Sequence, residues 1–136
     1  MYGILDISTS GMIAQRERMA VIASNIANRN AMIDVNGNPE PYRARRAIFA
    51  PGNPGATTEQ GRAMGVHVAA IEVDQSPLTP RWDPGNPFAH RSGPYAGYVM
   101  EPQVNTVVEQ INALEATRAY EANATVAEAT KQMVSQ

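Results

Sequence analysis

The sequence predicts an α+β fold in which long N- and C-terminal helices pair as a coiled coil, with a small irregular β-rich region between them. Apolar residues recur at helical spacing near both ends of the 136-residue chain. Most of the ten prolines and ten glycines lie between residues 37 and 102, which excludes a long helix there. We therefore divide the chain into an N-terminal helix (1–30), a β- and loop-rich middle (31–103) and a C-terminal helix (104–136).

The first helix is expected over residues 4–29. Its apolar seam repeats every seven residues and consists of Leu5, Met12, Met19 and Ile26, with Ile22 on the same side. Asp6, Ser8 and Ser10 are the candidate caps of its first turn. The helix ends on the segment "SNIAN" (24–28), because asparagine side chains compete for backbone hydrogen bonds and weaken a helix.

The middle of the chain reads as short strands separated by loops. We expect strands at 42–50, 66–73 and 95–100, and turns or loops at 36–41, 51–65 and 76–94. The last of these loops carries five prolines, so it can be neither a regular helix nor a central strand. The loop at 51–65 is expected to be mobile.

The C-terminal helix is expected over residues 104–134 and has two uncharged faces. A bulky stripe consists of Val104, Val107, Val108, Ile111, Leu114, Ala122, Val126, Ala129 and Met133, with Arg118 and Thr125 inside it. The opposite face carries Ala113, Ala116, Tyr120, Ala124 and Ala127. Two helices alone cannot bury both faces, so the pattern predicts assembly into something larger.

Motifs that carry chemistry are missing. The chain has no cysteine, which excludes disulfides, thiolate catalysis and cysteine metal sites. His67 and His90 have no neighbour at metal-ligand spacing, and no phosphate-binding loop is present. Glu121 and Glu128 lie one heptad apart and are interpreted as solvated or arginine-paired acids. We therefore expect no catalytic residues, no metal, no cofactor and no enzyme activity.

The charge pattern points away from nucleic acid and membranes. The net charge is −2, and ten of the eleven basic residues are arginines, which favour paired contacts at interfaces. We interpret the cluster Arg43, Arg45 and Arg46 as a partner in salt bridges between subunits. Residues 1–9 do not resemble a cleaved signal peptide, and no run approaches the roughly 18 apolar residues of a membrane span.

Two terminal segments resemble a known family. The segment "LDISTSGMIAQRERMAVIASNIAN" (5–28) is similar to the N-terminal signature of the bacterial flagellar rod and hook proteins, and "ATRAYEANATVAEATKQM" (116–133) is similar to their C-terminal pattern. The middle stretches "PYRAR" (41–45), "GVHVAAIEVDQSP" (65–77), "DPGNP" (83–87) and "GYVMEPQVN" (97–105) resemble the short proximal-rod subunits. The chain departs from the family at residues 29–32 and at Asn86.

The resemblance implies a structural subunit of the flagellar basal-body rod that polymerises through its terminal helices and transmits motor torque for motility. Its implied partners are copies of itself, other rod proteins and the flagellar type III export apparatus, with no nucleic acid and no membrane insertion. Its implied location is the periplasmic basal body, reached without a cleaved signal peptide.

Assembly contacts are expected at the two seams and the two signature segments. These residues are Leu5, Met12, Met19, Ile22, Ser24, Asn25, Ile26, Asn28, Val104, Ile111, Leu114, Arg118, Tyr120, Glu121, Asn123 and Val126. The residues of the two seams can equally form a core within one chain or a contact between subunits.

Two other interpretations stay open. The chain could be another flagellar axial subunit, although hook and distal-rod proteins are generally longer. It could instead be a soluble helical-hairpin adaptor that never polymerises. A rod subunit should have disordered terminal helices in isolation, because those helices lack their partners, whereas an adaptor should be fully folded.

Overall fold

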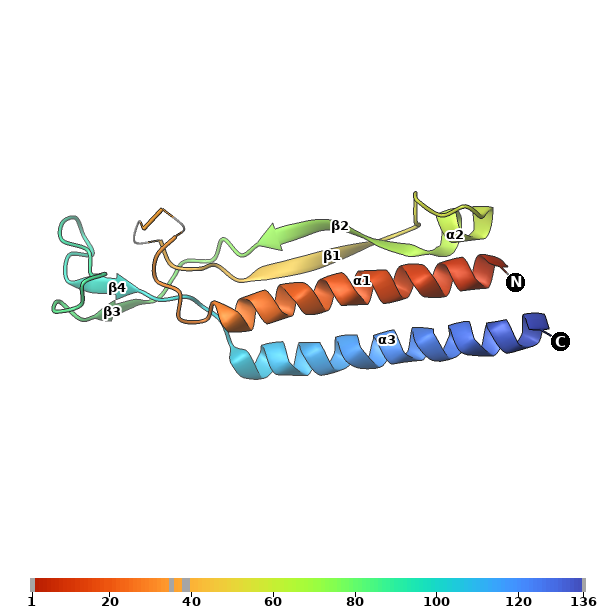
Figure 1. Cartoon of the computed structure of the whole chain (residues 1–136). Helices are drawn as coiled ribbons and strands as arrows, with labels where there is room; N and C mark the ends of the chain where they lie inside the picture. The colour runs from red at the N-terminus through yellow and green to blue at the C-terminus, as the bar shows by residue number, and fades with distance from the viewer. Residues whose placement is uncertain (1, 35, 38–39, 136) are drawn as a thin grey trace.

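The computed structural model describes residues 2–34, 36–37 and 40–135 and has an elongated shape (Figure 1). Its elements are α1 (Tyr2–Ala27), β1 (Arg45–Pro51), α2 (Glu59–Met64), β2 (Val66–Val73), β3 (Pro80–Trp82), β4 (Tyr98–Met100) and α3 (Thr106–Ser135). As expected, one long helix precedes the small β-rich middle in the sequence and the other follows it. Residues 38 and 39 of the expected turn at 36–41 lie outside the described residues.

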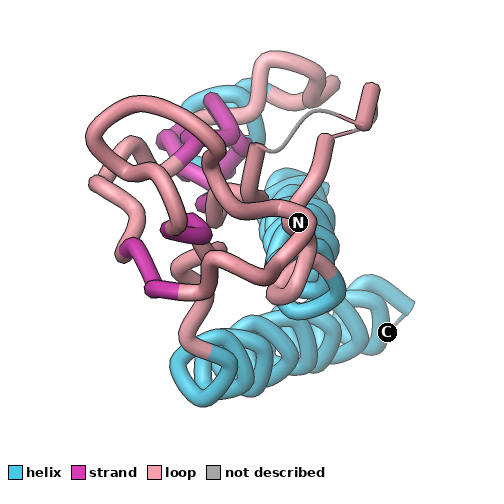
Figure 2. Tube along the Cα trace, turned by 90° about the vertical axis from the view of Figure 1, so that its left-hand side faces the viewer, coloured by secondary structure: helices cyan, strands magenta, loops and turns pink. Residues whose placement is uncertain are grey.

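Helix α1 is the central element of the molecule. It contacts α3, α2 and both strands of the β1–β2 hairpin, and the views in Figures 1 and 2 place α3 and this hairpin on different sides of it. Most of its buried residues are small or polar: Gly3, Ser8, Ser10, Gly11, Ala14, Val21, Ile22 and Asn25. Short side chains let three neighbouring segments approach the same helix closely.

Helix α3 packs on α1 through its small-residue face. The buried residues of α3 are Ala116, Ala127 and Thr130. Ile111, Leu114 and Val126 of the bulky stripe do not form a core within the chain, since their exposed fractions are 58%, 53% and 46%. The core within the chain therefore uses the face with smaller side chains.

The β1–β2 hairpin is antiparallel, with Arg45 opposite Val73 and Pro51 opposite Val66. Strand β2 has the expected bounds, whereas β1 begins and ends later than the expected 42–50. The register shifts between Ile48 and Phe49, and such an irregularity increases local twist. The twisted ribbon lies along α1 (Figure 1).

The expected loop at 51–65 contains a short helix, α2, which the sequence pattern did not indicate. Thr58 is its N-cap and accepts a hydrogen bond from the Gly61 N–H at 3.1 Å. Gly52 has a φ of +91°, and a Cβ there would lie 2.9 Å from the Arg62 carbonyl oxygen. This turn therefore requires glycine.

Strands β3 and β4 form a second two-stranded sheet that projects beyond the helix pair (Figure 1). We call residues 80–100 the tip. Pro80 occupies the first position of β3, where a missing N–H is tolerated. Val99 in β4 is completely buried. The ring of Trp82 lies against Gly97, whose φ of +83° and missing Cβ make room for it.

Candidate functional site

The end of α1 is a polar junction centred on Asn25, which is 1% exposed. Its Nδ2 donates to the Arg45 carbonyl at 2.8 Å and to Glu109 Oε2 at 3.2 Å. Its Oδ1 accepts from the Tyr42 hydroxyl at 2.6 Å and from the Arg45 N–H at 2.9 Å. All four hydrogen-bonding positions of the carboxamide are therefore used, and one side chain joins α1, β1 and α3.

The neighbouring residues of the "SNIAN" segment complete this junction. The Tyr42 hydroxyl donates to Asn25, so at 3.3 Å it accepts from the Ser24 hydroxyl. Asn28 Nδ2 donates to the Ser24 carbonyl at 2.9 Å, which adds a second hydrogen bond to the one from the Asn28 N–H at the end of the helix. Two of the three asparagines between residues 25 and 30 thus have defined roles where the chain leaves α1.

The first half of α1 holds the other end of the hairpin. Asp6 Oδ2 accepts from the Thr58 hydroxyl at 2.5 Å and from the Thr58 N–H at 3.3 Å. The Ser10 hydroxyl accepts from the Val66 N–H at 3.1 Å and donates to the Ile7 carbonyl at 2.7 Å. Helix α1 begins at Tyr2, so the expectation that Asp6, Ser8 and Ser10 cap it is wrong. Asp6 binds the N-cap of α2 instead, and Ser10 binds β2.

Four contacts fix how α1 and α3 align. They join Asn25 to Glu109, Arg18 to Glu115 (an ion pair of 3.6 Å), Met19 Sδ to the Thr117 hydroxyl (3.6 Å), and Gly11 to Asn123. Residue numbers rise along α1 while they fall along α3, so the two helices are antiparallel. Both chain ends lie at the same end of the molecule (Figure 1).

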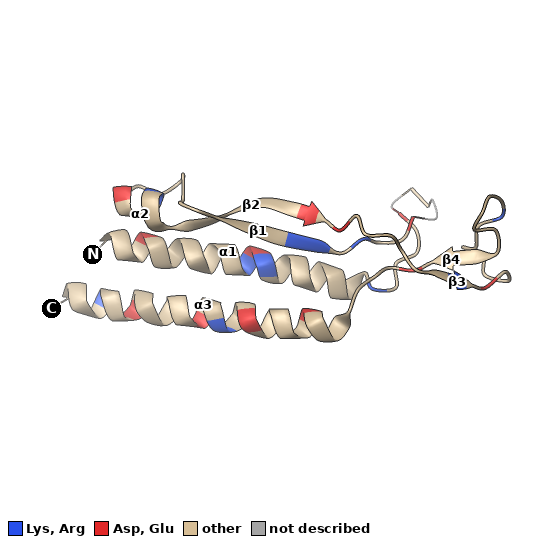
Figure 3. Ribbon diagram, turned by 180° about the vertical axis from the view of Figure 1, so that it is seen from behind, with Lys and Arg blue, Asp and Glu red and all other residues tan. Residues whose placement is uncertain are grey.

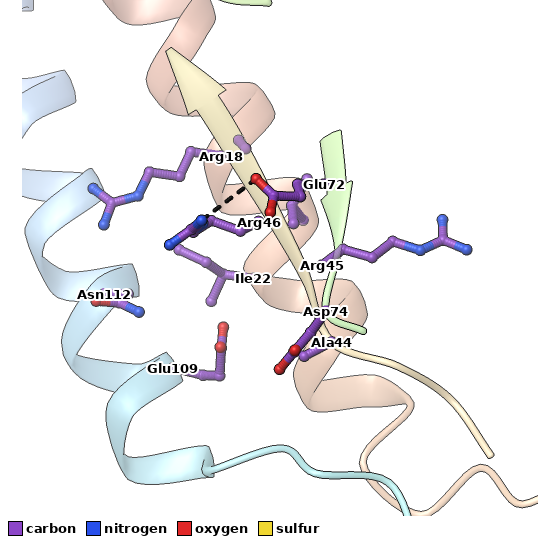
Figure 4. Close-up of a pocket in the computed structure, with 11 residues that line it drawn as sticks. Arg18, Ile22, Ala44, Arg45, Arg46, Glu72, Asp74, Glu109 and Asn112 are labelled. Atoms are coloured by element: carbon purple, nitrogen blue, oxygen red, sulfur yellow. Dashed lines mark hydrogen bonds and ion pairs between the residues drawn. The ribbon is translucent and has the colours of Figure 1, made fainter. Parts of the chain in front are cut away.

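A groove of about 470 Å³ lies between β1, α1 and α3 (Figure 4). Its lining mixes both signs of charge, with Arg46 paired to Glu72 at 3.4 Å. Hydrogen bonds from Ser76 hold the pKa of Asp74 below its usual value, with help from Arg43 and Arg46. Within the described residues, no three histidine or acidic side chains are close enough to hold a metal ion. The groove therefore offers paired charges and polar contacts.

The basic cluster at the start of β1 has partners in its own chain. Arg43 donates to the Ser76 carbonyl at 2.9 Å, Arg46 pairs with Glu72, and the Arg45 guanidinium lies 6.0 Å from the ring centre of Tyr42. Within one chain Arg46 thus has an acidic partner at the surface, and salt bridges between subunits stay a prediction for this cluster. His67, expected at the surface, is half-buried, with Nδ1 2.7 Å from the Gly52 carbonyl oxygen.

The expected assembly residues fall into three groups. Ile22 and Asn25 are buried inside the chain. The half-buried group is Leu5, Met12, Met19, Ser24, Ile26, Asn28, Val104, Tyr120 and Asn123. The exposed group is Ile111, Leu114, Arg118, Glu121 and Val126. Sequence reasoning missed Gly11, Tyr42 and Thr58 as contact residues, and it misassigned Asp6 and Ser10.

Helix α3 presents a largely apolar stripe to solvent. We call Val107, Ile111, Leu114, Ala122 and Val126, together with the embedded Arg118, the outer stripe. Val107, Ile111 and Leu114 are each more than half exposed. Arg118 makes no ion pair within the described part of the chain. Charged positions recur along both helices (Figure 3), but within the outer stripe Arg118 is the one charged residue. An exposed stripe of this kind suits contact with another protein.

No helix among the described residues combines the length and the hydropathy that a membrane span needs. The outer stripe is interrupted by Arg118 and flanked by Glu115 and Glu121. This composition is typical of a helix that packs on other helices.

Comparisons with known proteins show which sequences this chain is similar to. Residues 5–31 match the family model described as flagella basal body rod protein, and residues 95–136 match the model of the flagellar basal body rod FlgEFG protein C-terminal region. Over 98% of its length, the chain is 40% identical to the flagellar basal-body rod protein FlgC of Borreliella burgdorferi and covers 92% of that protein. It is 36% identical to FlgC of Buchnera aphidicola from Acyrthosiphon pisum (93% covered) and 37% identical to FlgC of Escherichia coli (92% covered), again over 98% of its own length.

Proposed function

The chain belongs to the FlgC family of flagellar basal-body rod proteins, and from this premise we propose that it is a structural subunit of the rod that assembles through its terminal helices. The observation that carries the assembly mode is the outer stripe of α3. Burying an apolar surface of this kind supplies most of the free energy of association between proteins. Monomeric proteins rarely expose a large apolar surface on a helix.

The partners follow from family membership. We infer that the subunit contacts copies of itself and other rod proteins, and that it has no enzymatic role. We also infer export through the flagellar type III apparatus without a cleaved signal peptide, and a final position in the periplasmic part of the basal body. The family relationship supports these points.

The fold has features that suit torque transmission. The small residues between α1 and α3 allow a close, stiff helix pair, because few flexible side chains separate the backbones. The Asn25 junction connects this pair to the start of β1 by hydrogen bonds to the strand backbone. Torque applied to the helices would therefore be transmitted to the β region through the hydrogen bonds of Asn25. It would not depend on a flexible linker.

The residues proposed for assembly are those left accessible on the helices. The outer stripe and Glu121 are accessible on α3, and Leu5 and Met12 are partly accessible on α1. Ile22 and Asn25 are proposed to act indirectly, since they shape the helix pair from inside.

The test is Ile111→Asp, which places a charge in the outer stripe. Ile111 is 58% exposed, so the substitution should leave folding and expression intact while it abolishes swimming and incorporation into basal bodies. The matched control is Gln110→Asp, which adds the same charge at an exposed neighbour outside the stripe. Swimming should be measured in soft agar, and incorporation by immunoblot of isolated basal bodies. Normal swimming of the Ile111 variant would refute this mode of assembly.

A further inference from the structure

The antiparallel helix pair places residues of α1 and α3 at matching heights along its axis. The contacts of Asn25 with Glu109 and of Gly11 with Asn123 fix the alignment at both ends. Because both helices rise by about 1.5 Å per residue, three further pairs lie level with each other. These are Ala27 with Val107, Ala23 with Ile111, and Ala20 with Leu114.

Helix α1 also has an outward surface, which we call the outer face of α1. It consists of the exposed residues Thr9, Ile13, Arg16, Ala20, Ala23 and Ala27, which recur at helical spacing. Neither α3 nor the β1–β2 hairpin covers these residues. Apart from Ile13 and Arg16, they are small.

The two exposed surfaces are complementary in size along their length. The large residues Val107, Ile111 and Leu114 of the outer stripe lie level with alanines of the outer face. The pattern reverses nearer the N-terminus, where the large Ile13 lies within one residue of the height of the small Ala122. Packing of this kind, large side chains opposite small ones, is what interdigitated helix contacts require.

The charges favour a particular fine alignment. Arg118 in the outer stripe is level with Arg16 but lies within one residue of the height of Glu17, which is exposed on α1. Arg16 in turn lies within one helical turn of the height of Glu121. None of these four side chains makes an ion pair within the described residues, since the known pairs involve other residues. Each arginine can therefore turn away from the other and toward the nearby acid.

We propose that the outer stripe of α3 in one copy packs on the outer face of α1 in a second copy, with little shift along the helix axis. This inference rests on the proposed rod function and names the partner surface for it. The two surfaces differ, so the contact is heterologous. It leaves an unused surface on each copy and repeats from subunit to subunit instead of closing as a two-fold dimer.

Engineered disulfides provide the first test, because the natural chain has no cysteine. The variant carrying both Ala20→Cys and Leu114→Cys should form a ladder of dimers and higher multimers when basal bodies are oxidised, as seen on a non-reducing gel. Each single variant should remain monomeric. The off-level control combines Ala20→Cys with Val126→Cys, which lie about twelve residues apart in height, or roughly 18 Å, and should form no ladder.

A charge exchange provides a second test that needs no oxidation. Arg118→Glu should reduce swimming at least tenfold, because it opposes Glu17 of the neighbour. Adding Glu17→Arg in the same chain should restore most of it, whereas Glu128→Arg in place of Glu17→Arg should not.

The outcomes separate the two proposals. A chain that is present in basal bodies but forms no ladder, or that forms one only with the off-level pair, overturns the α3-to-α1 contact and leaves the rod function standing. A charge exchange that restores no swimming overturns it likewise. Absence of the unmodified chain from basal bodies overturns the rod function itself.

Discussion

The backbone of Gly11 in α1 lies directly against the carboxamide of Asn123 in α3. A Cβ on Gly11 would be 2.7 Å from Asn123 Nδ2 and 2.9 Å from its Cγ. The carboxamide is itself held by a hydrogen bond from Nδ2 to the Ala119 carbonyl at 3.0 Å. The two residues belong to the N- and C-terminal signature segments, so this contact links the two parts of the chain that carry the family resemblance.

Gly11→Leu should destabilise the isolated chain by about 2 kcal/mol, since overpacking at a close helix contact commonly costs 1–3 kcal/mol. Thermal unfolding followed by circular dichroism should show a midpoint several degrees lower. Ala20→Leu, on the exposed outer face of the same helix, is the control and should leave the midpoint within a degree or two. An unchanged midpoint for Gly11→Leu would show that α3 is not seated there.

Asn25→Asp should destabilise the chain by about 3 kcal/mol at neutral pH. The carboxylate loses both donors and lies beside Glu109 and the Arg45 carbonyl. Burial next to another acid raises its folded-state pKa above the unfolded value, so the loss should shrink as pH falls and grow as pH rises. Urea unfolding at pH 7 and pH 5 measures this. Asn30→Asp, on an exposed residue nearby, is the control and should show neither effect.

Gly97→Ala should disturb the tip. The new Cβ would lie 2.6 Å from the ring of Trp82, and a φ of +83° is unfavourable for alanine. Trp82 is the single tryptophan, so its fluorescence reports this site alone. We expect an altered emission spectrum and a weaker near-ultraviolet dichroism signal, because Trp82 stacks edge-on with Tyr98 at 5.0 Å. Gly85→Ala, where a Cβ meets open space, should change neither signal.

Helix α3 should exchange its amide hydrogens before α1 does in the isolated chain. Among the described residues, α3 buries Ala116, Ala127 and Thr130, whereas α1 buries eight residues and hydrogen-bonds to β1, β2 and α2. Hydrogen exchange with mass spectrometry should therefore show α3 opening at lower free energy. Equal protection of both helices would favour a self-sufficient hairpin. Equally fast exchange would instead support the expectation that both terminal helices are disordered before assembly.

Local sequence patterns predicted much of the fold. Strand β2 has the expected bounds, and α1 and α3 begin and end within about two residues of expectation, because their signals are long and periodic. The proline-rich segment 76–94 indeed contains no helix, and its strand β3 lies in a two-stranded sheet.

The choice of face on α3 could not be made from periodicity. Hydrophobicity favours burying Ile111 and Leu114, yet the small face is buried because Gly11 and Ala14 on α1 offer a close approach that bulky side chains would prevent. The decisive information lies on the partner helix, about a hundred residues away in the sequence.

The polar contacts of α1 were missed for a related reason. Asp6 and Ser10 resemble local caps, and their actual partners, Thr58 and Val66, are more than fifty residues distant. Helix α2 has only six residues, too few to give a periodic signal, and it depends on the Thr58 cap and on Asp6. Hydrogen bonds between residues so far apart produce no recognisable pattern in the sequence around either residue.

The arrangement around α1 has a consequence for a chain delivered amino end first, through a ribosome or any narrow channel. Once Val73 has emerged, α1 already has its hydrogen-bonding partners at Thr58, Arg45 and Val66. The first half of the chain can therefore fold before α3 has emerged. Helix α3 would then dock on an α1–hairpin unit that is already folded. The larger side chains of its outer stripe would remain available for contact with a neighbouring protein.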